Sequence, residues 1–303
     1  MAVRLVVAVT DEDWFSHLRV HPNLTEVNFW APSAKNFRAL ISGEVFLFKL
    51  HSPRNYIVGG GIFLHASTMP CSLAWEAFGE SNGAASLVEM RARIAKHRHS
   101  EADDRIDFQL GCRILTQPFF FSEDRWIAAP ASPNSPFKTY STDEPDGLAL
   151  WNAVQEKLLT HTTRELREAP ARYGEPVLVR PRLGQGAFRV LVTDSYDRRC
   201  AVTGERTLPA LDAAHIRPFA EGGEHETSNG LLLRRDIHSL FDAGYVTVTP
   251  NMKFEVSRRI KEEFENGRHY YALHGQSVTP PKLAGRHPDV AALSWHNEQR
   301  FRR

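Results

Sequence analysis

The sequence is poor in cysteine and lacks any long apolar run. Its 303 residues include only three cysteines, Cys71, Cys112 and Cys200. An odd number of widely separated cysteines argues against a disulfide framework, so we predict reduced thiols in a cytoplasmic protein. No apolar run approaches the roughly 20 residues that a membrane-spanning helix requires, so no membrane partner is expected. An arginine at position 4 and acidic residues at 11–13 predict a first strand rather than a signal peptide.

A strong net charge is also absent. The chain has 37 Lys and Arg against 36 Asp and Glu, so its net charge of +1 creates no global basic field that would indicate a nucleic-acid partner. A composition of 42% hydrophobic and 24% charged residues is typical of a globular protein, and the length suits two domains. The proline- and glycine-bearing stretch 169–176 marks a boundary. We therefore predict a first domain at 1–170, a linker at 171–187 and a second domain at 188–303.

Residues 1–170 mix predicted strands and helices. Runs of apolar, β-branched and aromatic residues predict strands at 4–9, 43–50, 57–64 and 111–121, and 27–33 is an aromatic segment broken by proline. Helical spacing and capping residues predict helices at 11–18, 72–78, 86–96 and 148–167. One or two further helical turns are expected at 35–40, and a long surface loop at 128–147. This order is typical of an α+β fold, here a compact mixed β-barrel with helices at its openings.

Three short motifs in this region resemble the PUA-like superfamily, which includes the EVE and ASCH domains. They are Asn28-Phe-Trp30, Gly43-Glu-Val-Phe-Leu-Phe-Lys49 and Ile57-Val-Gly-Gly-Gly-Ile-Phe63. The first is an early aromatic segment, the second is a strand entered through a glycine and an acid, and the third is a glycine-bearing return strand. The resemblance implies a pocket that reads a base, often a modified one, flipped out of a duplex.

Such a base pocket needs aromatic faces for stacking and a few fixed polar groups for the base edge. The candidate walls are Trp30, Tyr56 and Trp75, and the candidate polar contacts are Ser33, Asn36, Lys49 and His51. Each has a plainer interpretation. An aromatic residue in a strand is more often part of the core, and Lys49 alternates with its apolar neighbours as a solvent-facing strand position does.

A basic, amphipathic segment opens the second domain. Phe188, Leu191 and Val192 have helical spacing and predict a helix at 188–196. Five arginines surround this helix: Arg180, Arg182, Arg189, Arg198 and Arg199. They are candidates for contacts with the DNA backbone, or alternatively form a solvated basic face.

The stretch from Leu211 to Asp242 carries the strongest functional signal. Leu211-Asp-Ala-Ala-His-Ile216, Ser228-Asn-Gly-Leu-Leu-Leu233 and Arg235-Asp-Ile-His-Ser-Leu-Phe-Asp242 predict strand, loop, strand and helix. Metal-assisted phosphodiester cleavage needs a base to activate water and a metal to stabilise charge. A histidine at the end of a strand serves as that base at neutral pH, and the helix delivers a metal ligand. His225, in the intervening loop, is expected to be exposed and without a role.

These residues, with eight positions between Asn229 and His238, resemble the HNH endonuclease family over about residues 186–250. That family has the ββα-metal fold. By position, the resemblance implies that His215 is the general base, Asn229 the structural residue that fixes the loop, and His238 a ligand of Mg²⁺ or Mn²⁺. Cys200-Ala-Val-Thr-Gly204 stands where zinc-ribbon members carry a Cys-x-x-Cys pair. Because no later cysteine follows, a structural four-cysteine zinc site is excluded, and Cys200 is predicted to be a buried apolar residue.

The second metal ligand is ambiguous. Many members have an acid immediately before the base, where this chain has Ala214. Asp212 lies two residues earlier on the same strand face, displaced by roughly 6–7 Å along the strand, and is one candidate. Asp242 follows His238 by four positions on the same helix face and is the other. Its alternative interpretation is a residue of the helix end.

Together these features predict a modification-dependent DNA endonuclease with a restriction role. The N-terminal domain would select a modified base, for example a modified cytosine, and the HNH domain would cut the backbone. The expected partner is double-stranded DNA that carries modified bases, and a homodimer would supply the two sites that double-strand cutting needs. Two alternatives stay open. The N-terminal domain binds RNA or unmodified DNA, or the HNH fold is a catalytically inactive nucleic-acid-binding module, which the missing acid at position 214 keeps open.

Overall fold

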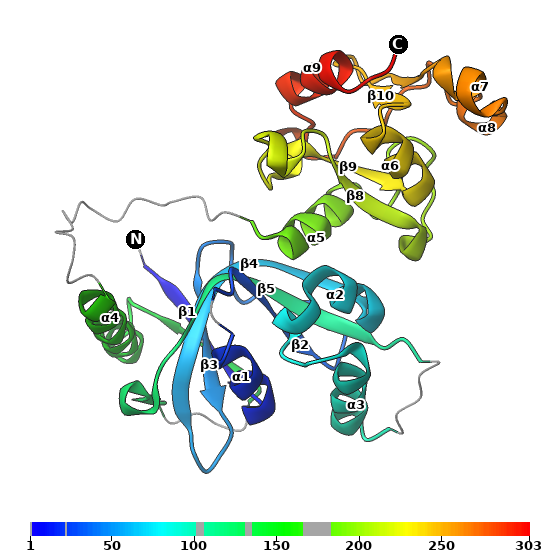
Figure 1. Ribbon diagram of the computed structural model, residues 1–303. Coiled ribbons are helices and arrows are strands. Elements are labelled where there is room, and N and C mark those ends of the chain that lie inside the picture. The colour runs from blue at the N-terminus through cyan, green and yellow to red at the C-terminus, as the bar shows by residue number, and fades with distance from the viewer. Residues whose placement is uncertain (1, 22, 101–105, 131–134, 166–182) are drawn as a thin grey trace. The chain divides into compact units, whose positions relative to one another are not determined.

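The computed structural model describes residues 2–21, 23–100, 106–130, 135–165 and 183–303 (Figure 1). The chain forms two compact units, Met1–Arg182 and Leu183–Arg303. Most of the predicted linker at 171–187, up to residue 182, lies outside the described residues. Its end, from Gln185 to Ala187, belongs to the first helix of the second unit.

A mixed sheet forms the centre of the N-terminal unit. Its strands are β1 (Arg4–Thr10), β2 (Glu26–Ala31), β3 (Val45–Leu50), β4 (Tyr56–Pro70), β5 (Gln109–Phe120), β6 (Ile127–Ala128) and β7 (Phe137–Ser141). The spatial order is β2-β5-β4-β3-β1-β7, and β6 pairs with β4. Strand β1 runs parallel to β3, whereas the other pairs are antiparallel. The prediction of an α+β fold with a mixed sheet is confirmed.

Helices α1 (Glu12–Arg19), α2 (Cys71–Phe78), α3 (Leu87–Arg98) and α4 (Pro145–Glu165) accompany this sheet, together with the 3-10 turns η1 (Gly79–Asn82) and η2 (Glu123–Arg125). The side chain of Ser86 caps α3 by accepting a hydrogen bond from the Glu89 amide, as the sequence indicates. Asp11 stands at the N-cap of α1, but its carboxylate forms no capping hydrogen bond. It contacts His51 and His97 instead.

Two predictions for this unit are wrong. Residues 35–40 form an irregular segment rather than helical turns, because an isolated turn is marginal and burial of Phe37 and Leu40 anchors the segment instead. Residues 128–147 are not one long loop. They contain β7, which pairs with β1 and buries Tyr140. The following helix begins three residues earlier than expected, at Pro145. Proline suits the first turn of a helix, where its missing N–H costs nothing.

The core of the N-terminal unit is aromatic on one side of the sheet. Trp14 and Phe15 of α1 belong to the same core cluster as Phe29, Phe46 and Phe48. The rings of Trp14 and Phe46 each contact those of Phe29 and Phe48, with centroids 4.8–6.2 Å apart. A polar network penetrates this unit beside the core. Buried Asn28 donates its amide N–H to Asn82 Oδ1 at 2.9 Å, so η1 is tied to the middle of β2.

The C-terminal unit is built around a strand–loop–strand–helix motif. The elements are α5 (Gln185–Ser195), β8 (Leu211–His215), β9 (Gly230–Arg234), α6 (Arg235–Asp242), β10 (Val246–Val248), β11 (Phe254–Val256), α7 (Arg259–Phe264), α8 (Arg268–Tyr271) and α9 (Val290–Gln299), with short turns η3 (Leu208–Ala210), η4 (Phe219–Glu221), η5 (Thr227–Asn229) and η6 (Ala284–Arg286). Strands β8 and β9 pair antiparallel, and α6 starts directly after β9 (Figure 1). The predicted order of elements around His215 and His238 is confirmed.

All three cysteines are buried, and none of them forms a disulfide. Cys200 begins a turn that backbone hydrogen bonds close, from the Cys200 amide to the Glu205 carbonyl at 2.8 Å and from the Gly204 amide to the Cys200 carbonyl at 2.9 Å. Cys200 is 2% exposed, as expected for a small apolar residue. Among the described residues, no helix has the length and apolar character that crossing a membrane demands.

The C-terminal tail packs against the body of its own unit. His296 of α9 contacts Thr247 Oγ1 through Nδ1 at 2.8 Å and the Phe241 carbonyl through Nε2 at 3.1 Å. Its ring stacks on Phe241 with centroids 3.7 Å apart. Farther along, the Arg302 amide donates to the Gly244 carbonyl. Because the carbonyl accepts from Nε2–H and Nδ1 accepts from the threonine hydroxyl, this packing suits the neutral imidazole.

We expect acid to destabilise the C-terminal unit through His296. Burial lowers the pKa of His296 to about 4, whereas an unfolded histidine has a pKa of about 6.5. The folded pKa lies below the unfolded pKa, so the stabilisation is complete above about pH 6.5 and is lost as the pH falls toward 4, by about 2 kcal/mol at pH 5. Urea unfolding at about pH 7.5 and pH 5 measures this loss.

The matched variants are His296→Gln, which keeps an acceptor and a donor but does not titrate, and His269→Gln, which removes an exposed histidine of the same unit. In His296→Gln, the difference in unfolding free energy between the two pH values should shrink by about 2 kcal/mol. In His269→Gln, this difference should be unchanged. Equal pH dependence in both variants would show that His296 is not the titrating group.

Candidate active site

Four of the predicted catalytic and metal-binding residues line one cleft in the C-terminal unit. Its volume is about 500 Å³. The predicted residues on its wall are His215, His238, Asp212 and Asp242. The other lining residues are Gln185, Phe188, Arg189, Ala213, Ile216, Pro218, Phe219, His296 and Arg300. The strand end, the helix and the loop between the strands therefore contribute to a single site.

His215 stands at the end of β8 and is held by two aromatic neighbours. Its ring stacks on Phe188 of α5 with centroids 3.9 Å apart and an interplanar angle of 10°. Its Nε2 lies 2.9 Å from Nδ1 of His225. Burial, together with the nearby His225 and His238, lowers the pKa of His215 to about 4. His215 is therefore neutral at pH 7, which is the form that accepts a proton.

The expectation that His225 is exposed is wrong. It is half-buried, contacts His215, and stacks on Phe219 with centroids 4.8 Å apart. Burial lowers its pKa as well. Nothing in the loop sequence indicates this contact, because ten positions of irregular chain separate the two histidines and only the folded loop brings them together.

Asn229 does not line the cleft but fixes the loop beside it. Its Oδ1 accepts from the Arg217 amide, and its Nδ2 donates to the carbonyls of Arg217 and Glu224, each at 2.9 Å. Its own carbonyl accepts from the Ile216 amide at 2.9 Å. Gly223 packs so closely here that a Cβ would overlap the Arg217 carbonyl. The side chain lies just before β9, at the end of η5, rather than on the strand itself.

His238 of α6 lies between the two candidate carboxylates. Its Nδ1 is 3.2 Å from Asp212 Oδ2, and its Nε2 is 3.3 Å from Asp242 Oδ2. Burial alone would lower the pKa of His238, but the hydrogen bonds to Asp212 and Asp242 raise it to about 9. Burial would likewise raise the pKa of Asp212, and the contacts with His238 and Arg189 lower it. The two carboxylates therefore favour the protonated form of the His238 ring.

The donor atoms suit a divalent cation, but the three side chains do not converge on one point. Imidazole nitrogen and carboxylate oxygen are suitable ligands for ions such as Mn²⁺ and Mg²⁺. Asp212 and Asp242, however, contact opposite nitrogens of the same ring. One carboxylate can share a metal with the nitrogen that it faces, and the other then orients the ring through the second nitrogen.

The predicted arginines divide into three groups. Arg189 lines the cleft and lies 3.3 Å from Asp212 Oδ1. Arg198, in the turn after α5, pairs with Asp194 of that helix at 3.1 Å, and Arg199 is exposed. Arg180 and Arg182 lie outside the described residues. Arg300 after α9, which is not one of these five arginines, also lines the cleft and pairs with Glu221.

The candidate residues of the N-terminal base pocket are only partly brought together. Trp30 donates its indole N–H to the Asn82 carbonyl at 2.9 Å and lies edge-on to His97, with centroids 6.1 Å apart. His97 and His51 both contact the Asp11 carboxylate, at 2.6 and 3.4 Å. Trp30 and His51 are thus linked through Asp11 and His97, two residues that the sequence motifs did not indicate.

The remaining candidates occupy other positions of the N-terminal unit. Tyr56 packs on Trp126 with centroids 5.9 Å apart. Ser33 and Asn36 are exposed in the segment after β2, Lys49 is half-buried in β3, and Trp75 is half-buried in α2. A role in base reading stays a prediction for each of these residues.

Comparison with known proteins identifies the C-terminal motif. Residues 200–249 match the HNH endonuclease family, so the resemblance seen in the sequence is confirmed and supports nuclease activity. No curated protein matches the chain. Similar solved structures include an ASCH protein from Zymomonas mobilis, with 9% identity, a TM-score of 0.32, and coverage of 48% of this chain and 94% of that one.

Two restriction endonucleases are also among the similar structures. The modification-dependent TagI has 15% identity, a TM-score of 0.29, and coverage of 96% of this chain and 81% of its own. The type IV phosphorothioation-dependent ScoMcrA has 10% identity, a TM-score of 0.20, and coverage of 77% and 49%. At such low TM-scores these likenesses carry no weight for function, which rests on the cleft and the family match.

We expect Asn229→Ala to cost both stability and activity. The substitution removes three hydrogen bonds and leaves loop carbonyls and an amide without their partner, at a cost of about 2–4 kcal/mol. Because those bonds set the path of the chain directly after His215, cleavage by the folded fraction should also fall. Urea unfolding and a plasmid-cleavage assay measure the two effects.

Asn297→Ala is the matched control. The Asn297 amide donates to the carbonyls of Val248 and Leu293, away from the His215 loop. This variant should lose stability and keep its specific activity. An Asn229→Ala protein with no greater loss of activity than Asn297→Ala would refute a role for Asn229 in shaping the site.

Proposed function

We propose that the protein, whose residues 200–249 match the HNH endonuclease family, is a modification-dependent DNA endonuclease that uses a divalent metal, Mg²⁺ or Mn²⁺. The observation that carries the proposal is the pairing of a neutral His215 with a carboxylate-bound His238 in one cleft. A proton acceptor and a set of metal-binding groups are the two components that hydrolysis of a phosphodiester requires.

His215 would take the proton of the attacking water. Its Nε2 is already engaged with His225 Nδ1, so Nε2–H donates to His225 and the lone pair of Nδ1 accepts the proton. Stacking on Phe188 holds the ring in place during this transfer. His225 is thus a positioning residue that selects the tautomer of the base.

His238 and Asp242 would hold the metal, and Asp212 would orient His238. Asp242 faces Nε2 from the same helix, four positions away, and its side chain is 61% exposed to the solvent. Asp212 is more enclosed and is already engaged by Arg189 and by the Ala213 amide. When bound, the metal would stabilise negative charge on the phosphate and the leaving oxygen. Its binding requires His238 to give up the proton that the two carboxylates hold there.

Arg189 and Arg300 would approach the DNA backbone from the cleft wall. Contacts of this kind fix the register of a duplex without reading its sequence. Selectivity would come from the N-terminal unit, in which Trp30, His97, Asp11 and His51 form a group of an aromatic face and polar edges. Stacking and edge contacts of this type are the means by which a flipped base is read. Cutting both strands needs two sites, so a homodimer on double-stranded DNA in the cytoplasm belongs to the proposal.

We expect cleavage of plasmids that carry modified bases, with Mg²⁺ or Mn²⁺, and little cleavage of the unmodified plasmid. The panel should contain plasmids with different cytosine and adenine modifications, and His215→Ala should reduce cleavage by at least about 100-fold because it removes the base. Equal cleavage of modified and unmodified DNA would refute modified-base reading, in favour of an N-terminal domain that binds RNA or unmodified DNA. No cleavage with either metal, with no difference in His215→Ala, would indicate an inactive binding module.

We further expect Asp242→His and Asp212→His to differ in metal preference. An imidazole in place of a carboxylate ligand favours later transition metals such as Co²⁺ and Ni²⁺ over Mg²⁺. The ratio of cleavage with Co²⁺ to cleavage with Mg²⁺ should therefore rise at least about tenfold in Asp242→His. Asp212→His should lower the rate without this change of ratio. The opposite pattern would assign Asp212 as the ligand and Asp242 as the residue of the helix end.

A further inference from the structure

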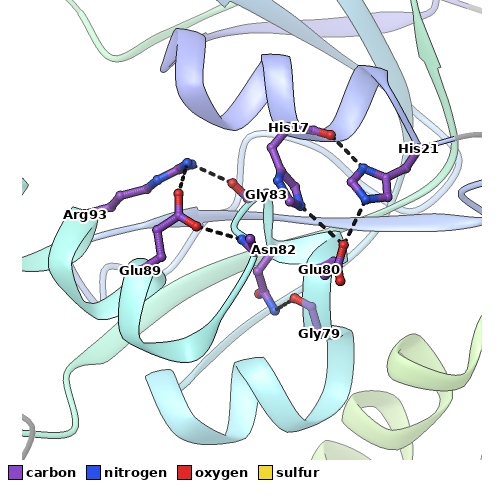
Figure 2. Close-up of polar contacts among 9 residues, drawn as sticks. His17, His21, Gly79, Glu80, Asn82, Gly83, Glu89 and Arg93 are labelled. Atoms are coloured by element: carbon purple, nitrogen blue, oxygen red, sulfur yellow. Dashed lines mark hydrogen bonds and ion pairs between the residues drawn. The ribbon is translucent and has the colours of Figure 1, made fainter.

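A second group of side chains that could bind a metal lies in the N-terminal unit, and none of its members is among the predicted site residues. His17 is in the last turn of α1, His21 follows the helix, and Glu80 belongs to η1. Figure 2 shows the two imidazole rings turned toward the Glu80 carboxylate. One donor atom from each residue lies within 4.8 Å of the other two, the only such group among the residues that the structure describes.

The distances match those of a small coordination shell. His21 Nε2 is 2.8 Å and His17 Nε2 is 3.7 Å from the same oxygen, Oε2 of Glu80. In a tetrahedral zinc site with metal–ligand bonds of about 2.0–2.2 Å, neighbouring ligand atoms are roughly 3.3 Å apart. The two distances lie on either side of that value, so small side-chain rotations would complete the geometry.

The second nitrogen of His21 is fixed in the way that metal-bound histidines commonly are. His21 Nδ1 lies 2.7 Å from the backbone carbonyl of His17 and donates to it. This bond sets the ring orientation and directs Nε2 at Glu80. A backbone carbonyl that accepts from the far nitrogen is a common outer partner of a metal-bound imidazole, because it fixes the tautomer and raises the basicity of the ligand.

An ion pair between a protonated His21 and Glu80 explains only part of this arrangement. His17 Nε2 is buried and, within the described part of the chain, has no hydrogen-bond partner. It points at the same carboxylate oxygen from beyond hydrogen-bond distance. A buried polar atom without a partner costs roughly 1–3 kcal/mol. A cation among the three donors would satisfy His17, His21 and Glu80 together, whereas a proton on His21 leaves His17 unsatisfied.

We propose that His17, His21 and Glu80 bind a divalent transition metal of the zinc class. Two imidazole nitrogens and one carboxylate oxygen favour Zn²⁺, Co²⁺ or Ni²⁺ over Mg²⁺ and Ca²⁺, which prefer all-oxygen shells. The Glu80 side chain is 56% exposed, so solvent reaches the site and water can supply the fourth ligand. This inference is independent of the proposed nuclease function.

The metal would join two segments that are distant in sequence. It would link the end of α1 to η1, whose Asn82 donates to the carbonyls of Ala74 and Gly79 and accepts from Asn28 (Figure 2 shows the bond to Gly79). Because Asn82 ties η1 to α2 and β2, a cross-link at Glu80 would stabilise the packing of three elements at once. The role that we assign to this site is therefore structural.

The test uses the full-length chain with His238→Ala, which removes the proposed metal ligand of the nuclease cleft. Co²⁺ titration followed by visible absorption, with competition by Zn²⁺, measures the remaining binding. We expect about one equivalent of Co²⁺ with the absorption of a low-coordinate site. Adding His21→Gln or Glu80→Gln to this background should weaken binding at least about tenfold, and the rise of the thermal midpoint with Zn²⁺ should disappear.

His99→Asn provides the matched control, since His99 is an exposed histidine of the same unit outside the cluster. It should bind Co²⁺ like the background protein. Far-ultraviolet circular dichroism checks that each variant remains folded. The proposal is overturned if the background protein binds no Co²⁺, which would leave a simple His21–Glu80 ion pair. It is equally overturned if His21→Gln and Glu80→Gln bind as tightly as His99→Asn.

Discussion

The side chain of Asn229 is the constraint on which the nuclease cleft depends. The loop between β8 and β9 leaves the sheet directly after His215 and returns to it at Gly230, and one amide group joins the two ends. A third bond, to the Glu224 carbonyl, shapes the middle of the loop. His225 follows Glu224 and therefore reaches His215 from a fixed path. The amide therefore constrains the chain on both sides of the His215–His225 contact.

The surroundings of two histidines in the same cleft shift their pKa values in opposite directions. His215 is enclosed by Phe188 and a second imidazole, and its pKa falls to about 4. His238 is also enclosed, but carboxylates face both of its nitrogens and its pKa rises to about 9. Such a separation of pKa values agrees with the roles proposed for the two residues, because a neutral ring is suited to accept a proton and a ring between carboxylates lies beside oxygen ligands for a cation.

The sequence indicates those parts of the molecule whose determinants are local. The strand, loop, strand and helix from Leu211 to Asp242 are close along the chain, so the spacing of His215, Asn229 and His238 fixes their relation. The contact of His225 with His215, and the pairing of Arg189 with Asp212, depend on how an irregular loop and α5 pack, and no local pattern encodes them. In the N-terminal unit, Asp11 and His97 are 86 positions apart and meet only in the folded chain. Residues 35–40 are irregular despite a local helical preference, because burial of Phe37 anchors the segment.

The turn at Cys200 shows that the fold of the C-terminal unit does not depend on metal coordination at this position. Where zinc-ribbon relatives would use four thiolates, this turn is closed by main-chain hydrogen bonds and its cysteine is packed as an apolar residue. In this unit, the proposed cleft metal would therefore serve catalysis rather than hold the fold together. A chelator should inhibit such a nuclease reversibly. Mild oxidants disrupt a zinc ribbon by oxidising its thiolate cluster, and this unit has no such cluster.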